Sequence, residues 1–199
     1  MKKIGTPALV AAIIGPIQSV SGWLIAGALW AGYDPISKTI SDLAAPESPV
    51  NAIMSSFFVL GGTLTLIASI YARTLAMPGR VALFVSALCT YGLTIFPTPL
   101  VGYSIMHRIF AISSFVLSAG WPLFAMRKRK DAPWIIRPLA SITATVLQAA
   151  LALWFLSTWT DPNATDVGLW ERVVAVSQSL YISVVIIVIY VSQRKSKTN

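Results

Sequence analysis

Three polar stretches of the chain carry residue types that could bind or transform a ligand, and each lies between long apolar runs. They are GYDPISKTISDLAAPESPVN (32–51), PTPLVGYSIMHRIF (97–110) and TDPNATDVGLWERVV (160–174). Their acidic, basic and hydroxyl side chains are the natural candidates for a site. The candidate ligand-binding residues are Asp34, Lys38, Ser41, Asp42, His107, Arg108, Glu171 and Arg172.

These residue types favour acid–base chemistry or anion binding. His107, the only histidine, could exchange a proton with Asp42 or Glu171, so these three are the candidate catalytic residues. Lys38, Arg108 and Arg172 could hold an anion through charge-assisted hydrogen bonds. One histidine with carboxylates is a poor zinc set, no nucleophile-elbow motif accompanies the serines, and a haem on the histidine would lack a second axial ligand. The sequence therefore predicts no metal site and no cofactor, and leaves open whether the protein is an enzyme.

The composition places these residues in a membrane protein. The chain has 199 residues, of which 56% are hydrophobic and 11% charged, and its mean hydropathy is +0.73. Soluble domains carry about 25% charged residues, so a soluble fold of this length could not bury so much apolar surface. The net charge of +8 does not indicate a nucleic-acid partner, because most basic residues stand in short loops and tails beside apolar runs.

Six apolar runs are long enough to cross a bilayer as helices, which takes about 20 residues each. The first run is roughly twice as long as the apolar core of a cleavable signal peptide, so it is interpreted as a retained span. The runs do not alternate every second residue as barrel strands would. The sequence therefore predicts an all-α six-helix transmembrane bundle, with a single domain over residues 1–199. The predicted spans are 7–32, 52–72, 80–97, 104–126, 134–157 and 169–192.

Positive charge predicts the orientation of the bundle. Twelve of the fifteen Lys and Arg residues fall on one side of a six-span topology, and Lys38, Arg108 and Arg172 fall on the other. Lys and Arg concentrate in cytoplasmic loops, so both termini are expected in the cytoplasm, with the bundle in a plasma membrane. The basic run RKRK (127–130) is interpreted as a topology determinant. The three polar stretches then all face the outer side.

The first polar stretch is expected to form a short amphipathic helix lying at the outer interface. Asp34 followed by Pro35 suits a helix start, and Ala45–Pro46 suits a stop. The apolar residues between them recur at helical spacing, with the charged residues on another face.

Polar residues inside the spans carry two further expectations. A charge within a span is costly, by about 2.5–3.5 kcal/mol at the centre and less toward the interface, so charged side chains there usually pair. The expected pairs are Arg108 with Glu171, and Arg172 with Asp42 or Asp34. Amide side chains such as Gln18, Gln148 and Gln178 are interpreted mainly as groups that bond neighbouring helices, with a polar tunnel as the alternative.

The run GYDPISKTISDLAAPESP, followed by an apolar span with GG, then FP and a later HR, resembles a known bacterial and archaeal membrane family. That family is catalogued as domain of unknown function nine hundred and ninety-eight. The resemblance covers most of the chain, and its most specific part is Tyr33 to Leu43. Phe96–Pro97, His107 and the WER of residues 170–172 are consistent with the family pattern. The resemblance implies a multi-span architecture and a place of interest, and it supplies no reaction, ligand or partner.

One main functional hypothesis and two alternatives follow. The main hypothesis is a polar site at the outer membrane face that would bind, and could also transform, a lipid headgroup or another anionic envelope molecule. Membrane lipids are then the expected partners. The alternatives are a non-catalytic membrane subunit whose outer loops contact a partner protein, and a small-solute permease. The sequence gives no indication of the oligomeric state.

Overall fold

The computed structural model describes residues 3–195, which are organised as helices joined by short connections. Six of these helices are long and apolar enough to cross a membrane, as predicted, so the chain is a multi-pass membrane protein. Lys2, Lys197 and Asn199, which contributed to the predicted orientation, lie outside the described residues. The elements are α1 (Thr6–Leu29), α2 (Ile40–Leu43), α3 (Asn51–Tyr71), α4 (Met77–Ile95), α5 (Ile105–Ala125), the 3₁₀ turn η1 (Trp134–Ile136), α6 (Pro138–Thr160) and α7 (Val167–Lys195).

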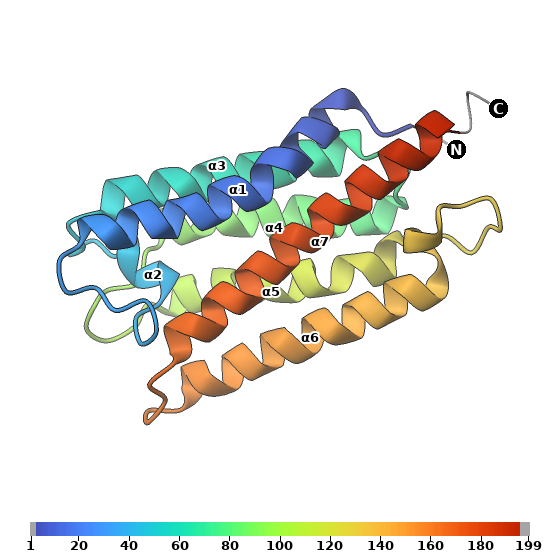
Figure 1. Ribbon diagram of the computed structural model, residues 1–199. Helices are drawn as coiled ribbons and strands as arrows, with labels where there is room; N and C mark the ends of the chain where they lie inside the picture. Colours follow the sequence, from blue (N-terminus) through green and yellow to red (C-terminus); the bar gives the residue numbers. More distant parts are fainter. Residues whose placement is uncertain (1–2, 196–199) are drawn as a thin grey trace.

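The six long helices form a closed ring in which neighbours in sequence are neighbours in space (Figure 1). Each packs on the next one along the chain, and α7 packs back on α1. Short connections make successive helices antiparallel. Prolines in the first turn suit the starts of α1, α4 and α6, because the first N–H groups of a helix have no helical acceptor.

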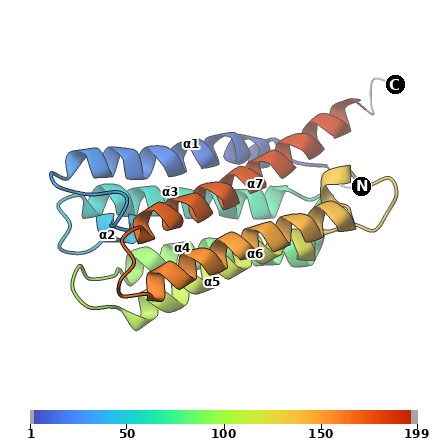
Figure 2. The same ribbon diagram turned by 60° about the horizontal axis from the view of Figure 1, so that its bottom comes forward.

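The bundle therefore has two distinct ends, which Figure 2 shows from a second direction. We call one of them the α2 end; it holds α2 and the loops 30–50, 96–104 and 161–166. We call the opposite one the terminal end, because α1 begins there and α7 ends there.

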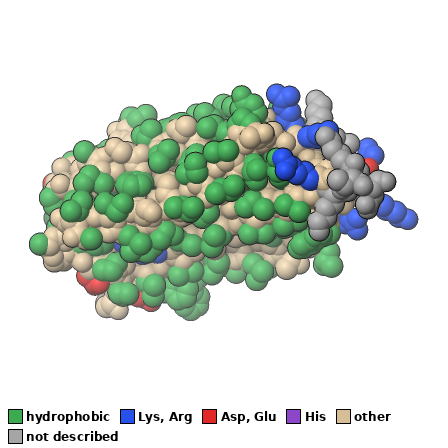
Figure 3. Space-filling view, turned by 45° about the horizontal axis from the view of Figure 1, so that its top comes forward, with side chains coloured by type: hydrophobic (Ala, Val, Ile, Leu, Met, Phe, Trp, Pro, Cys, Tyr) green, Lys and Arg blue, Asp and Glu red, His purple; other side chains and the backbone are tan. Residues whose placement is uncertain are grey.

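The sides of the bundle are apolar, and its interior contains polar side chains. Ile17 is 62% exposed and Leu153 is 66% exposed, whereas Ser86, Ser141 and Gln148 are buried. Figure 3 shows hydrophobic side chains over the flank of the molecule, with Lys and Arg gathered at the terminal end. A bilayer solvates such apolar flanks, while polar groups inside the bundle bond to one another.

Arginines at the terminal end bond to the last carbonyl groups of a helix and to the turn after it. Arg80 donates from Nε to the carbonyl of Ser69 and from Nη2 to that of Ile70, both at 2.7 Å. Arg127 donates to the carbonyl of Leu75 at 3.1 Å. The final carbonyls of a helix have no helical donor, so these side chains both satisfy the backbone and interact favourably with the helix dipole.

The first polar loop contains a short helix, as predicted, but its N-cap lies five residues later than predicted. Thr39 caps α2 through a capping box: its side chain accepts from the Asp42 N–H, and the Asp42 carboxylate accepts from the Thr39 N–H. Asp34 instead caps the preceding turn by accepting from the Ile36 N–H at 3.0 Å. Leu43, like its neighbours Ala44 and Ala45, is almost completely buried, so the segment folds over the end of the bundle.

Candidate functional site

The loop that contains α2 is held against the first turn of α7 by backbone contact. The Leu169 N–H donates to the Ile36 carbonyl at 3.0 Å. A Cβ atom placed on Gly168 would lie 2.0 Å from the carbonyl oxygen of Lys38, a separation that no side chain could tolerate. Glycine at this position therefore allows residues 33–45, which we call the α2 segment, to approach the helix backbone.

Arg172 fastens the first half of the α2 segment to α7. Its Nη1 donates to the carbonyls of Pro35 at 2.7 Å, Lys38 at 3.0 Å and Gly168 at 2.7 Å, and its Nη2 donates to the hydroxyl of Tyr33. The side chain is only 6% exposed. Arg172 is thus a buried cation solvated by backbone dipoles and a phenol rather than by a carboxylate.

Glu171 fastens the second half of the same segment. Its carboxylate accepts the backbone N–H of Ile40 and the Ser41 hydroxyl, the latter at 3.1 Å. Glu171 is also 6% exposed. Consecutive residues of α7 therefore satisfy both kinds of backbone group in the α2 segment, carbonyls through Arg172 and an N–H through Glu171.

Both predicted pairings of charged residues are wrong. Among the residues that the structure describes, neither Arg108 nor Arg172 forms an ion pair within 4.0 Å with its predicted partner, whereas Arg129 pairs with Asp131 at the terminal end. The α2 segment explains the difference, because most of it is neither helix nor sheet and its partly buried carbonyls beside α7 need donors. Arg172, with five N–H groups in a fixed fork, supplies several of them at once.

Five of the eight predicted ligand-binding residues line one cavity of about 130 Å³ at the α2 end. We call it the α2-end cavity. The α2 segment, the 96–104 loop, α5, α6 and α7 all contribute to its wall. The five are Ser41, Asp42, His107, Arg108 and Glu171, and the wall also includes Thr39, Thr98, Tyr103, Phe115, Phe155 and Trp159.

His107 is held in one orientation within this wall. It is 2% exposed, and its Nδ1 lies 3.0 Å from the carbonyl oxygen of Phe96. A carbonyl only accepts hydrogen bonds, so Nδ1 carries the proton and Nε2 is the basic nitrogen of the neutral ring. The Ser104 hydroxyl fixes the start of α5 by accepting the His107 N–H at 3.2 Å. The ring therefore lines the cavity with its acceptor nitrogen free of hydrogen bonds to residues 3–195.

Arg108 contributes the exposed cation of the cavity. Its guanidinium carbon lies 4.5 Å from the ring centroid of Tyr103 and 5.5 Å from that of Trp159. Within the described residues it forms no ion pair. The Asp42 carboxylate, on the same wall, is engaged with the Thr39 N–H at 2.8 Å. The carboxylates of the cavity thus bond to the α2 segment, while the guanidinium rests on two aromatic rings.

The other predicted residues do not reach this cavity. Asp34 is exposed, and its pKa is lowered by the hydrogen bond from the Ser37 hydroxyl and by the backbone N–H of Ile36. Lys38 places its ammonium 4.7 Å from the centre of the Trp30 ring. Arg172 instead binds the carbonyls of the α2 segment.

Sequence reasoning missed Thr39, Thr98, Tyr103 and Trp159 as parts of the wall. The signal that could have suggested Tyr103 and Trp159 is their place near the ends of apolar runs, where amphipathic rings collect at the membrane interface. Thr39 belongs to the pattern Thr-x-x-Asp, which is a recognisable capping box.

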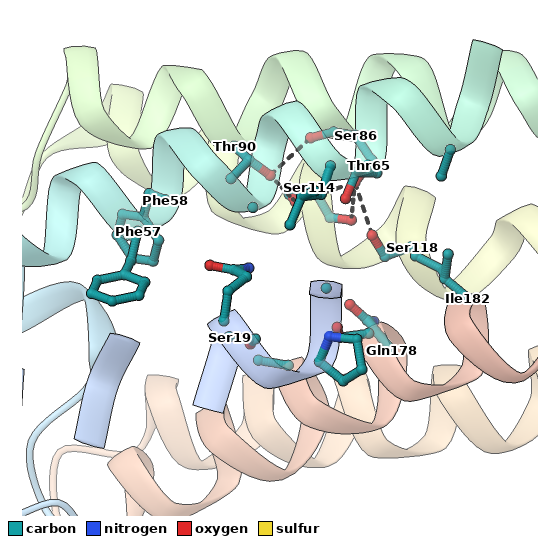
Figure 4. Close-up of a pocket in the computed structure, with 18 of the residues that line it drawn as sticks. Ser19, Phe57, Phe58, Thr65, Ser86, Thr90, Ser114, Ser118, Gln178 and Ile182 are labelled. Carbon is teal, nitrogen blue, oxygen red and sulfur yellow. Dashed lines mark hydrogen bonds between the residues drawn. The ribbon is translucent and has the colours of Figure 1, made fainter. Parts of the chain in front are cut away.

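A second polar cavity, of about 180 Å³, lies in the middle of the bundle. Figure 4 shows Ser86, Thr90, Ser114 and Ser118 on one side of it and Ser19 and Gln178 on the other. The Ser86 and Ser118 hydroxyls lie 2.8 Å apart and link α4 to α5. We call it the mid-bundle cavity, and its lining carries no charged side chain.

The amides near this level agree only partly with the predicted role in helix packing. Gln148 donates to the Ser177 carbonyl at 3.2 Å and accepts from its hydroxyl at 3.1 Å, and Gln178 donates to the Phe115 carbonyl at 3.0 Å. These contacts bond neighbouring helices, as predicted. The Oε1 of Gln18 and the Nε1 of Trp23 are instead buried without a hydrogen-bond partner in the described part of the chain, and both residues line the mid-bundle cavity.

Comparison with known proteins gives a family and no function. The sequence profile of a family described as protein of unknown function (DUF998) matches residues 13–188. No curated protein and no solved structure shows significant similarity to the chain. The matched range begins within α1, ends within α7 and includes every residue of the α2-end cavity. The chain therefore belongs to the DUF998 family of proteins of unknown function.

Proposed function

We propose that the α2-end cavity binds the anionic group of a lipid headgroup or of another envelope molecule. The observation that carries the proposal is the environment of Arg108. Its guanidinium lies against the rings of Tyr103 and Trp159 and forms no ion pair within the described chain. Contact through its face leaves its N–H edges open, and this planar fork matches phosphate or carboxylate oxygens in a bidentate arrangement.

The acidic residues of the cavity are compatible with an anion because their oxygens already have donors. Glu171 accepts from Ile40 and Ser41, and Asp42 accepts from Thr39. Nε2 of His107 remains as an acceptor for a hydroxyl group of the ligand, and it would take up the proton if the ligand were also transformed. The proposed division of roles is an anion on Arg108 and a hydroxyl group on His107.

The α2 end is proposed to face away from the cytoplasm of a plasma membrane, with both chain termini inside. The support is the gathering of Lys and Arg at the terminal end, since such residues are retained on the cytoplasmic side. A fluorescent or enzymatic reporter fused after Asn199 should be active only in the cytoplasm. Activity of a reporter that works only outside the membrane would reverse the orientation and remove the envelope ligand from consideration.

Binding of glycerol phosphate to the protein in a neutral detergent tests the proposed site. Wild-type protein should gain thermal stability as the ligand saturates it, because a ligand that binds only the folded state stabilises it. Arg108→Gln should weaken binding by roughly tenfold to a hundredfold, which is the loss of a hydrogen bond to a charged group worth about 1.5–3 kcal/mol.

Arg129→Gln is the matched control, because it removes an exposed cation at the terminal end. Its affinity should equal that of the wild type. If Arg108→Gln binds glycerol phosphate as tightly as this control does, or if the wild type does not bind it, the proposed function fails.

A second function, passage of a small neutral solute, has one observation in its favour. Gln18 and Trp23 each bury a polar atom without a partner beside the mid-bundle cavity. Buried polar atoms almost always have partners, so these two suit water or a small hydroxylated molecule. Glycerol should then enter proteoliposomes faster than protein-free liposomes, and Gln18→Leu should slow it. Equal rates with and without protein would eliminate this function.

A further inference from the structure

A groove on the flank of the bundle, between α5 and α6, differs in character from both cavities. Its volume is about 300 Å³. Small residues such as Ala119 and Ala149 line it, together with the larger Ile112, Val116 and Leu153, which are 41%, 60% and 66% exposed. The groove therefore opens toward the surface that a bilayer would cover. We call it the α5–α6 groove.

The α5–α6 groove is continuous with the α2-end cavity. Phe115, Phe155 and Trp159 line both. Their rings form a contiguous wall, with centroids 5.2 Å apart between Phe115 and Phe155 and 5.8 Å apart between Phe155 and Trp159. Trp159 also carries the guanidinium of Arg108 at 5.5 Å. The end of the groove at Trp159 therefore lies beside Arg108, the exposed cation of the α2-end cavity.

The lining of the groove is apolar apart from Thr145 and the indole of Trp159. Its one hydroxyl, on Thr145, accepts the backbone N–H of Leu123 at 3.1 Å. Along α6 the lining runs from Thr145 to Trp159, roughly 20 Å of helix at 1.5 Å per residue. One leaflet accounts for about 15 Å of the hydrocarbon core. The groove is thus an apolar channel somewhat longer than one leaflet, and one of its ends meets the charged α2-end cavity.

We propose that the α5–α6 groove holds an acyl chain of the same molecule whose anionic headgroup occupies the α2-end cavity. The ligand is then a phospholipid or a similar long-chain phosphate ester, and a free anion would use only half of the site. This inference rests on the proposed function for its headgroup half. The continuity of the two spaces through shared aromatic residues is what links the chain to the headgroup.

The test measures retention of phosphatidylglycerol by native mass spectrometry of the full-length protein, with glycerol phosphate binding measured in parallel. Ala149→Phe fills the groove, while Ala150→Phe places the same side chain one position further along α6 on an exposed surface. Ala149→Phe should weaken phosphatidylglycerol binding by about tenfold, the effect of losing roughly two buried methylene groups. Ala150→Phe should bind it as the wild type does, and all three proteins should bind glycerol phosphate equally.

The outcomes separate this inference from the proposed function. If both variants retain phosphatidylglycerol equally and still bind glycerol phosphate, the retained lipid is annular lipid only. This result would overturn acyl-chain binding in the α5–α6 groove and leave the headgroup site standing. Retention of diacylglycerol as tightly as phosphatidylglycerol, with no binding of glycerol phosphate, would overturn the headgroup site itself. If Ala149→Phe also loses glycerol phosphate binding, the smaller substitution Ala152→Val replaces it in the same comparison. Weaker retention of phosphatidylglycerol with unchanged binding of glycerol phosphate then supports the groove, and equal retention overturns it.

Discussion

The two polar cavities of this bundle solve the problem of burying polar groups in opposite ways. The α2-end cavity contains charged side chains, and its carboxylates bond to the α2 segment that covers it. The mid-bundle cavity contains neutral hydroxyl and amide groups. Because the cost of a charge falls toward the membrane interface, charge can be placed at the end of the bundle and not at its middle. The proposed recognition of a charged ligand is therefore assigned to the α2 end.

Among substitutions at the α2 end and in the mid-bundle cavity, a substitution of Arg172 should reduce stability most. Arg172→Met removes the donor for three backbone carbonyls and for the Tyr33 hydroxyl. We expect the free energy of unfolding to fall by ~3 kcal/mol, because the Pro35 carbonyl and the Tyr33 hydroxyl each lose a charged donor, and such a hydrogen bond contributes ~1.5–3 kcal/mol. The Lys38 carbonyl still accepts from the Tyr33 hydroxyl at 3.1 Å. Unfolding in mixed micelles with rising dodecyl sulfate measures this loss, and hydrogen exchange should increase across residues 33–45.

Arg108→Met is the control for that experiment. Arg108 is exposed and contacts aromatic rings, an interaction of about 0.5–1 kcal/mol at an exposed site. A loss in Arg108→Met equal to that in Arg172→Met would contradict the assignment of one arginine to anchoring and the other to ligand binding.

Gly168→Ala should have the next largest effect, again at the α2 end. The added Cβ would meet the Lys38 carbonyl at 2.0 Å, so the α2 segment must move away. Overpacking of this kind typically costs about 1–3 kcal/mol. Gly120→Ala, where the nearest atom would be Phe124 at 3.4 Å, should be neutral or slightly stabilising. Equal melting temperatures for the two variants would argue against the close approach.

Tyr33 gives the α2 segment a dependence on alkaline pH. Burial raises the pKa of Tyr33 from its ordinary value of 10.0 to about 12. The folded state then holds the phenol proton more tightly than the unfolded state does. This contribution to stability is complete below pH 10.0 and is lost as the pH rises through about 12. Wild-type protein should lose stability over this window more than Tyr33→Phe does, and parallel alkaline unfolding curves would be the contrary result.

The smallest effect is expected in the mid-bundle cavity. Ser86→Ala removes the hydroxyl that contacts Ser118 at 2.8 Å. Interhelical bonds of this type contribute about 0.6 kcal/mol each in membrane proteins. The same dodecyl sulfate titration measures it. A loss as large as that of Arg172→Met would erase the distinction between a charged, anchored end and a neutral interior.

The sequence was sufficient to predict the fold because the signals were local. Runs of about 20 apolar residues identify spans, and the structure has six helices of that kind within the described residues. Charged and polar residues near the span ends also pointed to Asp42, His107, Arg108 and Glu171 as members of one site, and all four line the α2-end cavity.

The partners of those charges could not be predicted. Arg172 and Glu171 bond largely to backbone carbonyl and N–H groups of the α2 segment, and backbone groups carry no residue-specific pattern in a sequence. The start of α2 was predicted at Asp34 because an aspartate before a proline is a strong capping signal. The capping box at Thr39 prevails in the structure, since it satisfies two backbone groups reciprocally.

A crystal structure of the protein grown from a lipidic mesophase that contains phosphatidylglycerol would show directly whether the α2-end cavity binds an anionic headgroup. We expect a phosphate group beside Arg108 in the α2-end cavity, with an acyl chain along the α5–α6 groove. The contrary result would be an α2-end cavity that holds only water while the mid-bundle cavity is occupied at the same lipid content.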